Sequence, residues 1–305
     1  MASTRGNLYI HIMVFQPIDP SPPPFRRRFK PIPVRTLLPN LITLLALCAG
    51  LTAIRVAVEN NIQLALGAIV LAAVLDGIDG RVARLLKGTS RFGAELDSLA
   101  DFVNFGVAPA LVLYFWSLNE LRSAGWIAAM VFAICAGLRL ARFNVMSDDP
   151  NRPVWAGNFF TGIPAPAGAI TVLLPIYLGF LGLSGGLIGV WFTFAYTLAI
   201  ALLMVSRLPV FSGKRVGKRV PPEMVLPLFV LVVLFFALLI AYPWEVLAIG
   251  SVVYLCCLPL GYWSYREYQR KDAVVAAAAA NAGEAAVPQP PAAAASGDER
   301  PARLN

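Results

Sequence analysis

Long apolar stretches, separated by short polar or proline-containing segments, dominate the chain between about residues 34 and 271. A membrane-spanning helix needs about 20 mostly apolar residues. This pattern predicts an all-α integral membrane protein with eight transmembrane helices, the first six forming a core and the last two being additional. The predicted spans are 36–57, 62–86, 92–118, 123–146, 159–181, 186–206, 222–242 and 245–266.

Polar and low-complexity segments divide the chain into four parts. Residues 1–33 are rich in proline and arginine and are expected to form a disordered tail, and residues 34–206 form the six-helix membrane core. A basic loop and the two further helices occupy residues 207–271. The alanine- and proline-rich residues 272–305 have the composition of a second disordered tail.

The composition supports a membrane protein rather than a soluble one. Of the 305 residues, 58% are hydrophobic and 14% are charged, whereas a soluble domain has about 45–50% and about 25%. The net charge is +8, but basic loops that fix the orientation of a membrane protein explain this excess better than nucleic acid does. We therefore expect membrane lipids as partners and no nucleic acid.

Basic residues are distributed unevenly over the predicted loops. If the N-terminus is cytoplasmic, the outer segments carry only Arg55 and Arg122. The positive-inside rule then places both termini on the cytoplasmic side of the cell (inner) membrane. The inner segments carry Arg26, Arg27, Arg28, Lys30, Arg35, Lys87, Arg91, Arg152, Lys214, Arg215, Lys218, Arg219, Arg266, Arg270 and Lys271.

The chain offers few side chains for histidine or thiolate chemistry. Its four cysteines lie in apolar stretches and form no CxxC pair, and its only histidine is His11. Neither a zinc site nor a disulfide framework is indicated. Carboxylates must therefore carry any metal or proton chemistry.

The second and third predicted spans contain acidic residues that a lipid-buried helix would not tolerate. Asp76 and Asp79 lie near the end of one span, and Asp97 and Asp101 lie near the start of the next. Each ionisable residue inside a membrane costs about 2.5–3.5 kcal/mol on insertion scales. Divalent cations would compensate this cost, and an all-oxygen ligand set favours Mg²⁺ or Mn²⁺.

The spacing of these residues supports a shared site. The aspartates of each span are three or four residues apart, so they lie on one helical face. Gly80 and Gly93 permit a close approach of ligand or backbone, and Arg84, one turn past Gly80, could neutralise a phosphate. The set suits a diphosphate-bearing substrate. The alternative is a structural polar patch, in which Arg81 or Arg84 pairs with an aspartate of the neighbouring helix.

The whole string resembles the signature of the CDP-alcohol phosphatidyltransferases position for position. That resemblance implies a six-helix catalytic core, two divalent cations (Mg²⁺ or Mn²⁺), a homodimer, and a site open to the cytoplasm and the inner leaflet. The string reads Asp76-x2-Asp79-Gly80-x2-Ala83-Arg84-x8-Gly93-x3-Asp97-x3-Asp101.

The resemblance also implies a role for each position. Asp76 and Asp97 would bridge both metals, Asp79 would complete the first metal site, and Asp101 would complete the second and act as the general base. The remaining positions concern the CDP-lipid. Asn40 and Thr43 would either touch it or cap the first helix, and the others that would contact it or leave room for it are Gly80, Ala83, Arg84, Ser90 and Gly93.

Further segments resemble the phosphatidylserine synthases of that family, and they imply CDP-diacylglycerol and L-serine as substrates and phosphatidylserine and CMP as products. Arg139 and Arg142 share one helical face, where guanidinium groups could bind the serine carboxylate or anchor the helix to lipid head groups. Choline, glycerol 3-phosphate or an inositol derivative are alternative acceptors. A transporter fits less well, because the acids lie at one face and not at the midplane. The segments are 38–43, 97–109, 139–144 and 160–166.

Overall fold

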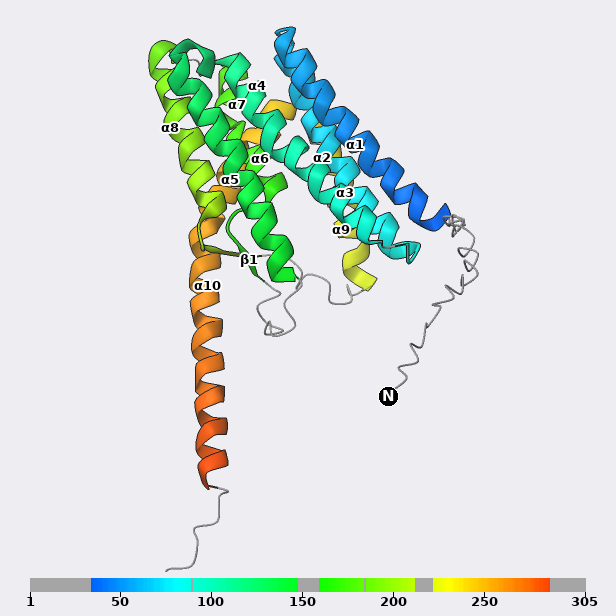
Figure 1. Cartoon of the computed structure of the whole chain (residues 1–305), viewed down its shortest axis with the longest axis vertical. Coiled ribbons are helices and arrows are strands. Elements are labelled where there is room, and N and C mark those ends of the chain that lie inside the picture. The colour runs from blue at the N-terminus through cyan, green and yellow to red at the C-terminus, as the bar shows by residue number, and fades with distance from the viewer. Residues whose placement is uncertain (1–33, 89, 148–158, 184, 212–221, 286–305) are drawn as a thin grey trace, which may run out of the picture. The chain divides into compact units, whose positions relative to one another are not determined.

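The computed structural model describes residues 34–88, 90–147, 159–183, 185–211 and 222–285, and the chain from Val34 onward forms one compact unit. The predicted all-α membrane fold is confirmed, with a single two-stranded ribbon in the described residues (Figure 1). The elements are α1 (Val34–Val58), α2 (Ile62–Leu85), α3 (Arg91–Asp101), the π-helix η1 (Phe102–Val107), α4 (Ala108–Trp116), the 3₁₀ helix η2 (Leu118–Leu121), α5 (Ser123–Ser147), β1 (Phe159–Thr161), α6 (Ala165–Val172), α7 (Leu174–Phe180), α8 (Gly186–Val205), β2 (Pro209–Phe211), α9 (Pro222–Ala241) and α10 (Pro243–Ala285).

The described residues contain seven helical segments that are long and apolar enough to cross a membrane. The fifth expected span, 159–181, instead begins as strand β1 and continues as the shorter helical segment Ala165–Phe180. That segment still runs the length of the core. It starts beside the β ribbon at the end of α8, and its far end reaches the cavity where α4 ends and α8 begins.

A proline explains why this segment is broken into α6 and α7. Pro175 has no N–H, so the helical bond to the carbonyl of Thr171 cannot form. The hydroxyl of Tyr196 on α8 donates to that carbonyl instead, at 2.8 Å. The segment is also buried by its neighbours, with Ile176 and Tyr177 at most 1% exposed. A helix wrapped in protein does not need the length of one that faces lipid.

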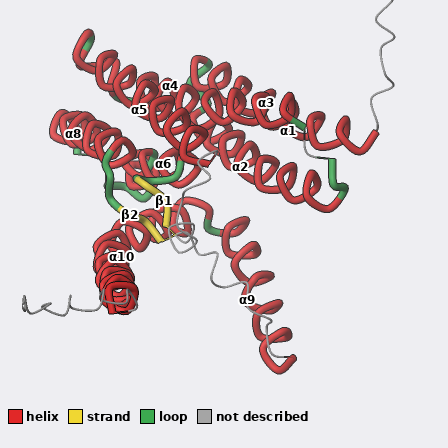
Figure 2. The backbone as a smooth tube through the Cα atoms, turned by 60° about the horizontal axis from the view of Figure 1, so that its bottom comes forward, coloured by secondary structure: helices red, strands yellow, loops and turns green. Residues whose placement is uncertain are grey.

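The β ribbon joins two loops that are distant in sequence. β1 pairs antiparallel with β2, so that Phe160 lies opposite Val210. Gly162 follows β1 with φ of 76°, and its N–H donates to the carbonyl of Leu208 at 2.8 Å. Figure 2 shows the ribbon beside α10, which contacts β2. Strands of three residues are too short to show a period-2 pattern, so they could not be predicted from the sequence.

Small residues let the first two helices pack closely. α1 and α2 form the most extensive helix pair, and Ala53 and Ala57 of α1 are buried with Ala65 and Ala72 of α2. Small residues at helix contacts are typical of membrane proteins, where close van der Waals packing drives association. Large apolar side chains are instead exposed on the outer faces, where lipid would cover them.

The two C-terminal helices differ from the core. The apolar window of α9 is not buried at all, and α9 contacts α10. α10 continues to Ala285, although the sequence favoured a disordered tail from residue 272. Alanine has the highest helix propensity of any residue, which explains the extension through the alanine-rich segment. The expected disorder of residues 1–33 and 286–305 lies outside the described residues.

Candidate active site

A short turn brings the two acid-bearing helices together. Leu86 ends α2, and Lys87 adopts a left-handed conformation with φ of 49°. Ser90 then caps α3, because its Oγ accepts a 3.0 Å hydrogen bond from the N–H of Gly93. The chain therefore reverses within a few residues, and the last turns of α2 and the first turns of α3 line the same cavity.

Three of the four predicted metal ligands form a tight cluster. Asp76 on α2 and Asp97 and Asp101 on α3 each offer a carboxylate oxygen, and these oxygens lie within 4.8 Å of one another. The Oδ1 atom of Asp101 is buried and has no hydrogen-bond partner in the described part of the chain. Carboxylates this close repel one another unless a cation or proton lies between them. The cluster fits a hard divalent cation.

Asp79, the fourth predicted ligand, points to the neighbouring helix α1. Its side chain is only 3% exposed, and its Oδ2 accepts a 2.6 Å hydrogen bond from Oγ1 of Thr43. Thr43 also donates toward the carbonyl of Pro39, one turn earlier, at 3.1 Å. Asp79 and Asp97 nevertheless line the same cavity, so Asp79 lies beside the three-carboxylate cluster.

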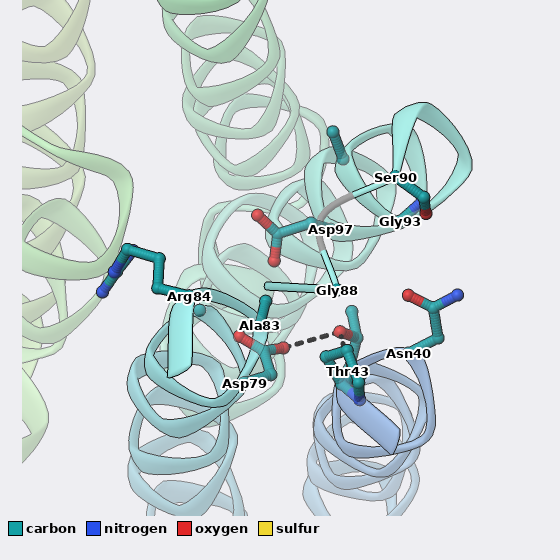
Figure 3. Close-up of a pocket in the computed structure, with 12 residues that line it drawn as sticks. Asn40, Thr43, Asp79, Ala83, Arg84, Gly88, Ser90, Gly93 and Asp97 are labelled. Carbon is teal, nitrogen blue, oxygen red and sulfur yellow. Dashed lines mark hydrogen bonds between the residues drawn. The ribbon is translucent and has the colours of Figure 1, made fainter. Parts of the chain in front are cut away.

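That cavity has a volume of about 190 Å³ and opens between α1, α2 and α3 (Figure 3). It is lined by all seven residues predicted to contact the CDP-lipid, and these residues come from three separate segments of the sequence. Their positions are therefore brought together, while their roles stay predictions. The lining residues are Pro39, Asn40, Thr43, Asp79, Gly80, Ala83, Arg84, Gly88, Ser90, Gly93, Ala94 and Asp97.

The two predicted glycines have different neighbours. A methyl group at Gly93 would lie 2.7 Å from Oδ1 of Asn40, so glycine allows α3 to approach α1. A methyl group at Gly80 would lie 3.6 Å from Nη1 of Arg84, which is ordinary contact. The guanidinium of Arg84 thus lies over the surface of Gly80, at the edge of the cavity.

The two predicted serine-binding arginines on α5 have different surroundings. Arg142 donates from Nη1 to the carbonyl of Val205 at 2.7 Å and so ties α5 to the end of α8. Arg139 is 7% exposed and lies within electrostatic range of Asp101. Its Nε is buried without a hydrogen-bond partner in the described residues, and its guanidinium lies 5.2 Å from the ring of Phe143. Arg139 is therefore the arginine that faces the carboxylate cluster.

Sequence reasoning missed several polar groups near the site. The π-helix η1 begins directly after Asp101, and its Asn104 is 1% exposed with neither amide atom partnered in the described residues. Asn104 packs against Gly50, where no side chain would fit. Tyr254 on α10 lies within electrostatic range of Arg139. Single π turns often mark functional sites, but no sequence pattern signals Tyr254.

Models of known protein families match two parts of the chain. The model described as CDP-alcohol phosphatidyltransferase matches residues 36–205, which is more than half of the chain. The chain belongs to the CDP-alcohol phosphatidyltransferase family. A second model, described as CDP-alcohol phosphatidyltransferase 2, matches residues 223–259 in α9 and α10. Members of the family generally depend on divalent cations, and the aspartate cluster supplies suitable ligands.

Relatives of this phosphatidyltransferase chain come from bacteria and archaea. A CDP-diacylglycerol–serine O-phosphatidyltransferase of Mycobacterium tuberculosis is 40% identical over 75% of this chain and 79% of its own length. The enzyme of that name from Helicobacter pylori is 36% identical over 74% of this chain and 90% of its own length. An archaetidylserine synthase of Methanothermobacter thermautotrophicus is 32% identical over 55% of this chain and 67% of its own length.

Proposed function

We propose that this phosphatidyltransferase transfers the phosphatidyl group of CDP-diacylglycerol to the hydroxyl of L-serine, forming phosphatidylserine and CMP. The observation that carries the proposal is the position of the cavity. All seven positions expected to meet a CDP-lipid line it, and it shares Asp97 with the three-carboxylate cluster. The names of the relatives, which act on CDP-diacylglycerol and serine, support the same substrates.

We propose two divalent cations, Mg²⁺ or Mn²⁺, at the aspartates. Asp76, Asp97 and Asp101 would hold them together with Asp79, which lies beside the cluster. When bound, such cations neutralise diphosphate charge and stabilise the charge that develops on the leaving CMP. Thr43 on α1 donates a hydrogen bond to Asp79 and so fixes the orientation of this carboxylate.

The reaction requires one group that accepts a proton and another that holds the phosphates, and we assign each role to a side chain of this protein. Asp101 takes the proton from the serine hydroxyl, whose oxygen forms a bond to the β-phosphorus of CDP-diacylglycerol. The bond between that phosphorus and the bridging oxygen breaks, and CMP leaves with the electron pair. Arg84, which lines the cavity, holds the phosphates there.

The choice of serine rests on the pairing of Asp101 with Arg139. A carboxylate accepts hydrogen bonds, whereas the buried Nε of Arg139 only donates one. A ligand that satisfies both needs a hydroxyl for Asp101 and an anionic group for Arg139, and L-serine has both. Choline carries no anion, and inositol carries no charge. Glycerol 3-phosphate has both groups, but its phosphate has more negative charge than a carboxylate and would require a denser basic pocket. Arg142, with Nη1 engaged at Val205, supports the wall of this region by holding α5 to α8.

A direct assay tests the proposed function. The purified protein is given CDP-diacylglycerol with Mg²⁺ or Mn²⁺ and one acceptor at a time: L-serine, choline, glycerol 3-phosphate or inositol. We expect CMP and phosphatidylserine in equal amounts with serine, and little product with the others. Preferential use of glycerol 3-phosphate would refute the serine assignment while leaving the reaction class intact. CMP release that is independent of any acceptor or metal would refute both.

We also propose an orientation and an assembly state. Arg84, Lys87 and Arg91 surround the turn between the acid-bearing helices, whereas the turns at the other end of these helices carry Arg55 and Arg122. The positive-inside rule therefore favours a cytoplasmic site and cytoplasmic termini in the cell membrane. The family resemblance favours a homodimer, which cross-linking in native membranes would test.

A further inference from the structure

Two buried polar side-chain atoms, one on α5 and one on α10, have no hydrogen-bond partner in the described residues. One is Nε of Arg139 on α5, and the other is the hydroxyl of Tyr254 on α10. The two side chains lie within electrostatic range of each other, as Arg139 also does of Asp101. They do not form a hydrogen bond with each other. Buried polar groups are nearly always satisfied in a native protein, and an orphaned pair therefore calls for a missing partner.

The chemistry of the three groups defines that partner. Arg139 is 7% exposed and can only donate a hydrogen bond from Nε. The phenol of Tyr254 can also donate one, whereas the ionised carboxylate of Asp101 can only accept. A small molecule with an anionic group at one end and a hydroxyl at the other would satisfy all three. Neither a purely apolar ligand nor a cation would do so.

We propose that Tyr254 of α10 completes the acceptor subsite, where its hydroxyl and Arg139 together hold the carboxylate of the acceptor alcohol. This inference rests on the proposed function and adds a specificity residue to it. It also assigns a function to α10, one of the two C-terminal helices. α10 lies against β2, α6 and α7, and this packing presents Tyr254 to the core from outside the six-helix region. The second family match, residues 223–259, includes this position.

The proposal has a kinetic consequence that simple packing of Tyr254 does not have. The Tyr254→Phe variant loses only the hydroxyl and should keep its fold. We expect its KM for serine to rise about ten- to a hundredfold, the range for a lost hydrogen bond to a charged group, while its KM for CDP-diacylglycerol stays within about twofold. The Tyr262→Phe variant is the matched control, because Tyr262 lies further along α10, where its ring is stacked under Arg266.

An analogue of serine tests the chemistry of the contact. Serinol keeps the hydroxyl and amine of serine but replaces the carboxylate with a hydroxymethyl group. Wild-type protein should prefer serine to serinol, and both Tyr254→Phe and Arg139→Gln should reduce that preference. The double variant should lose less than the product of the two single effects, because both groups hold the same carboxylate.

The possible outcomes separate this inference from the proposed function. If wild-type protein uses another alcohol, serine is the wrong acceptor, and the variants are then measured with the alcohol that reacts. A raised KM for that alcohol alone would still support the subsite. An unchanged acceptor KM in Tyr254→Phe, or an equal rise in the KM for CDP-diacylglycerol, would overturn it. Thermal unfolding of each variant in detergent shows whether the fold is retained.

Discussion

Thr43 on α1 donates a 2.6 Å hydrogen bond from Oγ1 to Oδ2 of Asp79 on α2, at the wall of the cavity. Both residues are at most 5% exposed, so they have little access to water as an alternative partner. This contact joins the helix that enters the core first to the helix that carries the first two aspartates. It makes the orientation of Asp79, a proposed metal ligand, depend on a residue outside the aspartate motif.

Replacing Thr43 with valine should therefore lower both stability and activity. The Thr43→Val variant keeps the shape of the side chain but leaves the buried Asp79 carboxylate without its donor, at a cost of about 1–3 kcal/mol. Thr43→Ser should restore most of the loss. Thr52→Val is the control, because Thr52 is exposed on the same helix and bonds to the carbonyl of Cys48. Thermal unfolding in detergent and serine-dependent CMP release measure the two effects, and equal behaviour of both valine variants would contradict the argument.

Removal of one charge from the carboxylate cluster should disable the site. Asp97→Asn or Asp76→Asn should reduce turnover by about a hundredfold or more and weaken the binding of divalent ions, because a metal ligand set loses an anion. Binding of Mn²⁺ to purified protein, followed by electron paramagnetic resonance, is a readout that does not need turnover. Glu95→Gln is the control, because Glu95 is an exposed acid on α3 outside the cluster. Unchanged Mn²⁺ binding in both Asp variants would refute the metal site.

Arg84 should act on the CDP-lipid and not on the acceptor. Arg84→Ala should raise the KM for CDP-diacylglycerol about ten- to a hundredfold, because a charge-assisted contact to phosphate is lost. The KM for serine should change little. Arg81→Ala is the matched control, since Arg81 is an exposed arginine of α2 that does not line the cavity. Steady-state kinetics with each substrate varied in turn would decide, and a selective effect on serine would reverse the assignment.

A methyl group at Gly93 should displace the side chain of Asn40 and crowd the cap of α3. The added Cβ would lie 2.7 Å from Oδ1 of Asn40, a predicted CDP-lipid contact, and 3.1 Å from Oγ of Ser90, which caps the helix that carries Asp97 and Asp101. We expect a loss of stability of about 1–3 kcal/mol, as for other overpacked sites, together with a clear loss of turnover. Gly67→Ala should be neutral or slightly stabilising, because nothing lies within 4 Å of its added Cβ. Similar unfolding temperatures for the two variants would contradict this packing argument.

Cysteine labelling should place the carboxylate cluster at the cytoplasmic end of the helices. In a background without native cysteines, Arg91→Cys at the start of α3 should be protected from a membrane-impermeant maleimide added to intact cells. Glu59→Cys, in the turn after α1, should react. Both positions are exposed in the structure, so the difference reports the side of the membrane. The reverse labelling pattern would invert the proposed orientation.

The sequence by itself determined the membrane fold and most of the candidate site. Helix periodicity is local, so the spacing of Asp76, Asp97 and Asp101 already places each carboxylate on a definite helical face. Because the turn after α2 is short, the two acid-bearing helices form a hairpin. The expected carboxylate cluster follows from these local rules, whereas the meeting of Asn40 and Thr43 of α1 with the other CDP-lipid positions at one cavity depends on how α1 packs.

Only the tertiary structure decided the features that depend on contacts between distant segments. The sequence predicted the same role for Arg139 and Arg142. In the structure, α5 packs against α8 so that Arg142 donates to the carbonyl of Val205, whereas Arg139 lies within electrostatic range of Asp101. The placement of Tyr254 likewise depends on how α10 packs against the β ribbon and α6–α7. Hydrophobic periodicity shows that a helix has an apolar surface, but which neighbour that surface meets is set by the packing of the whole assembly.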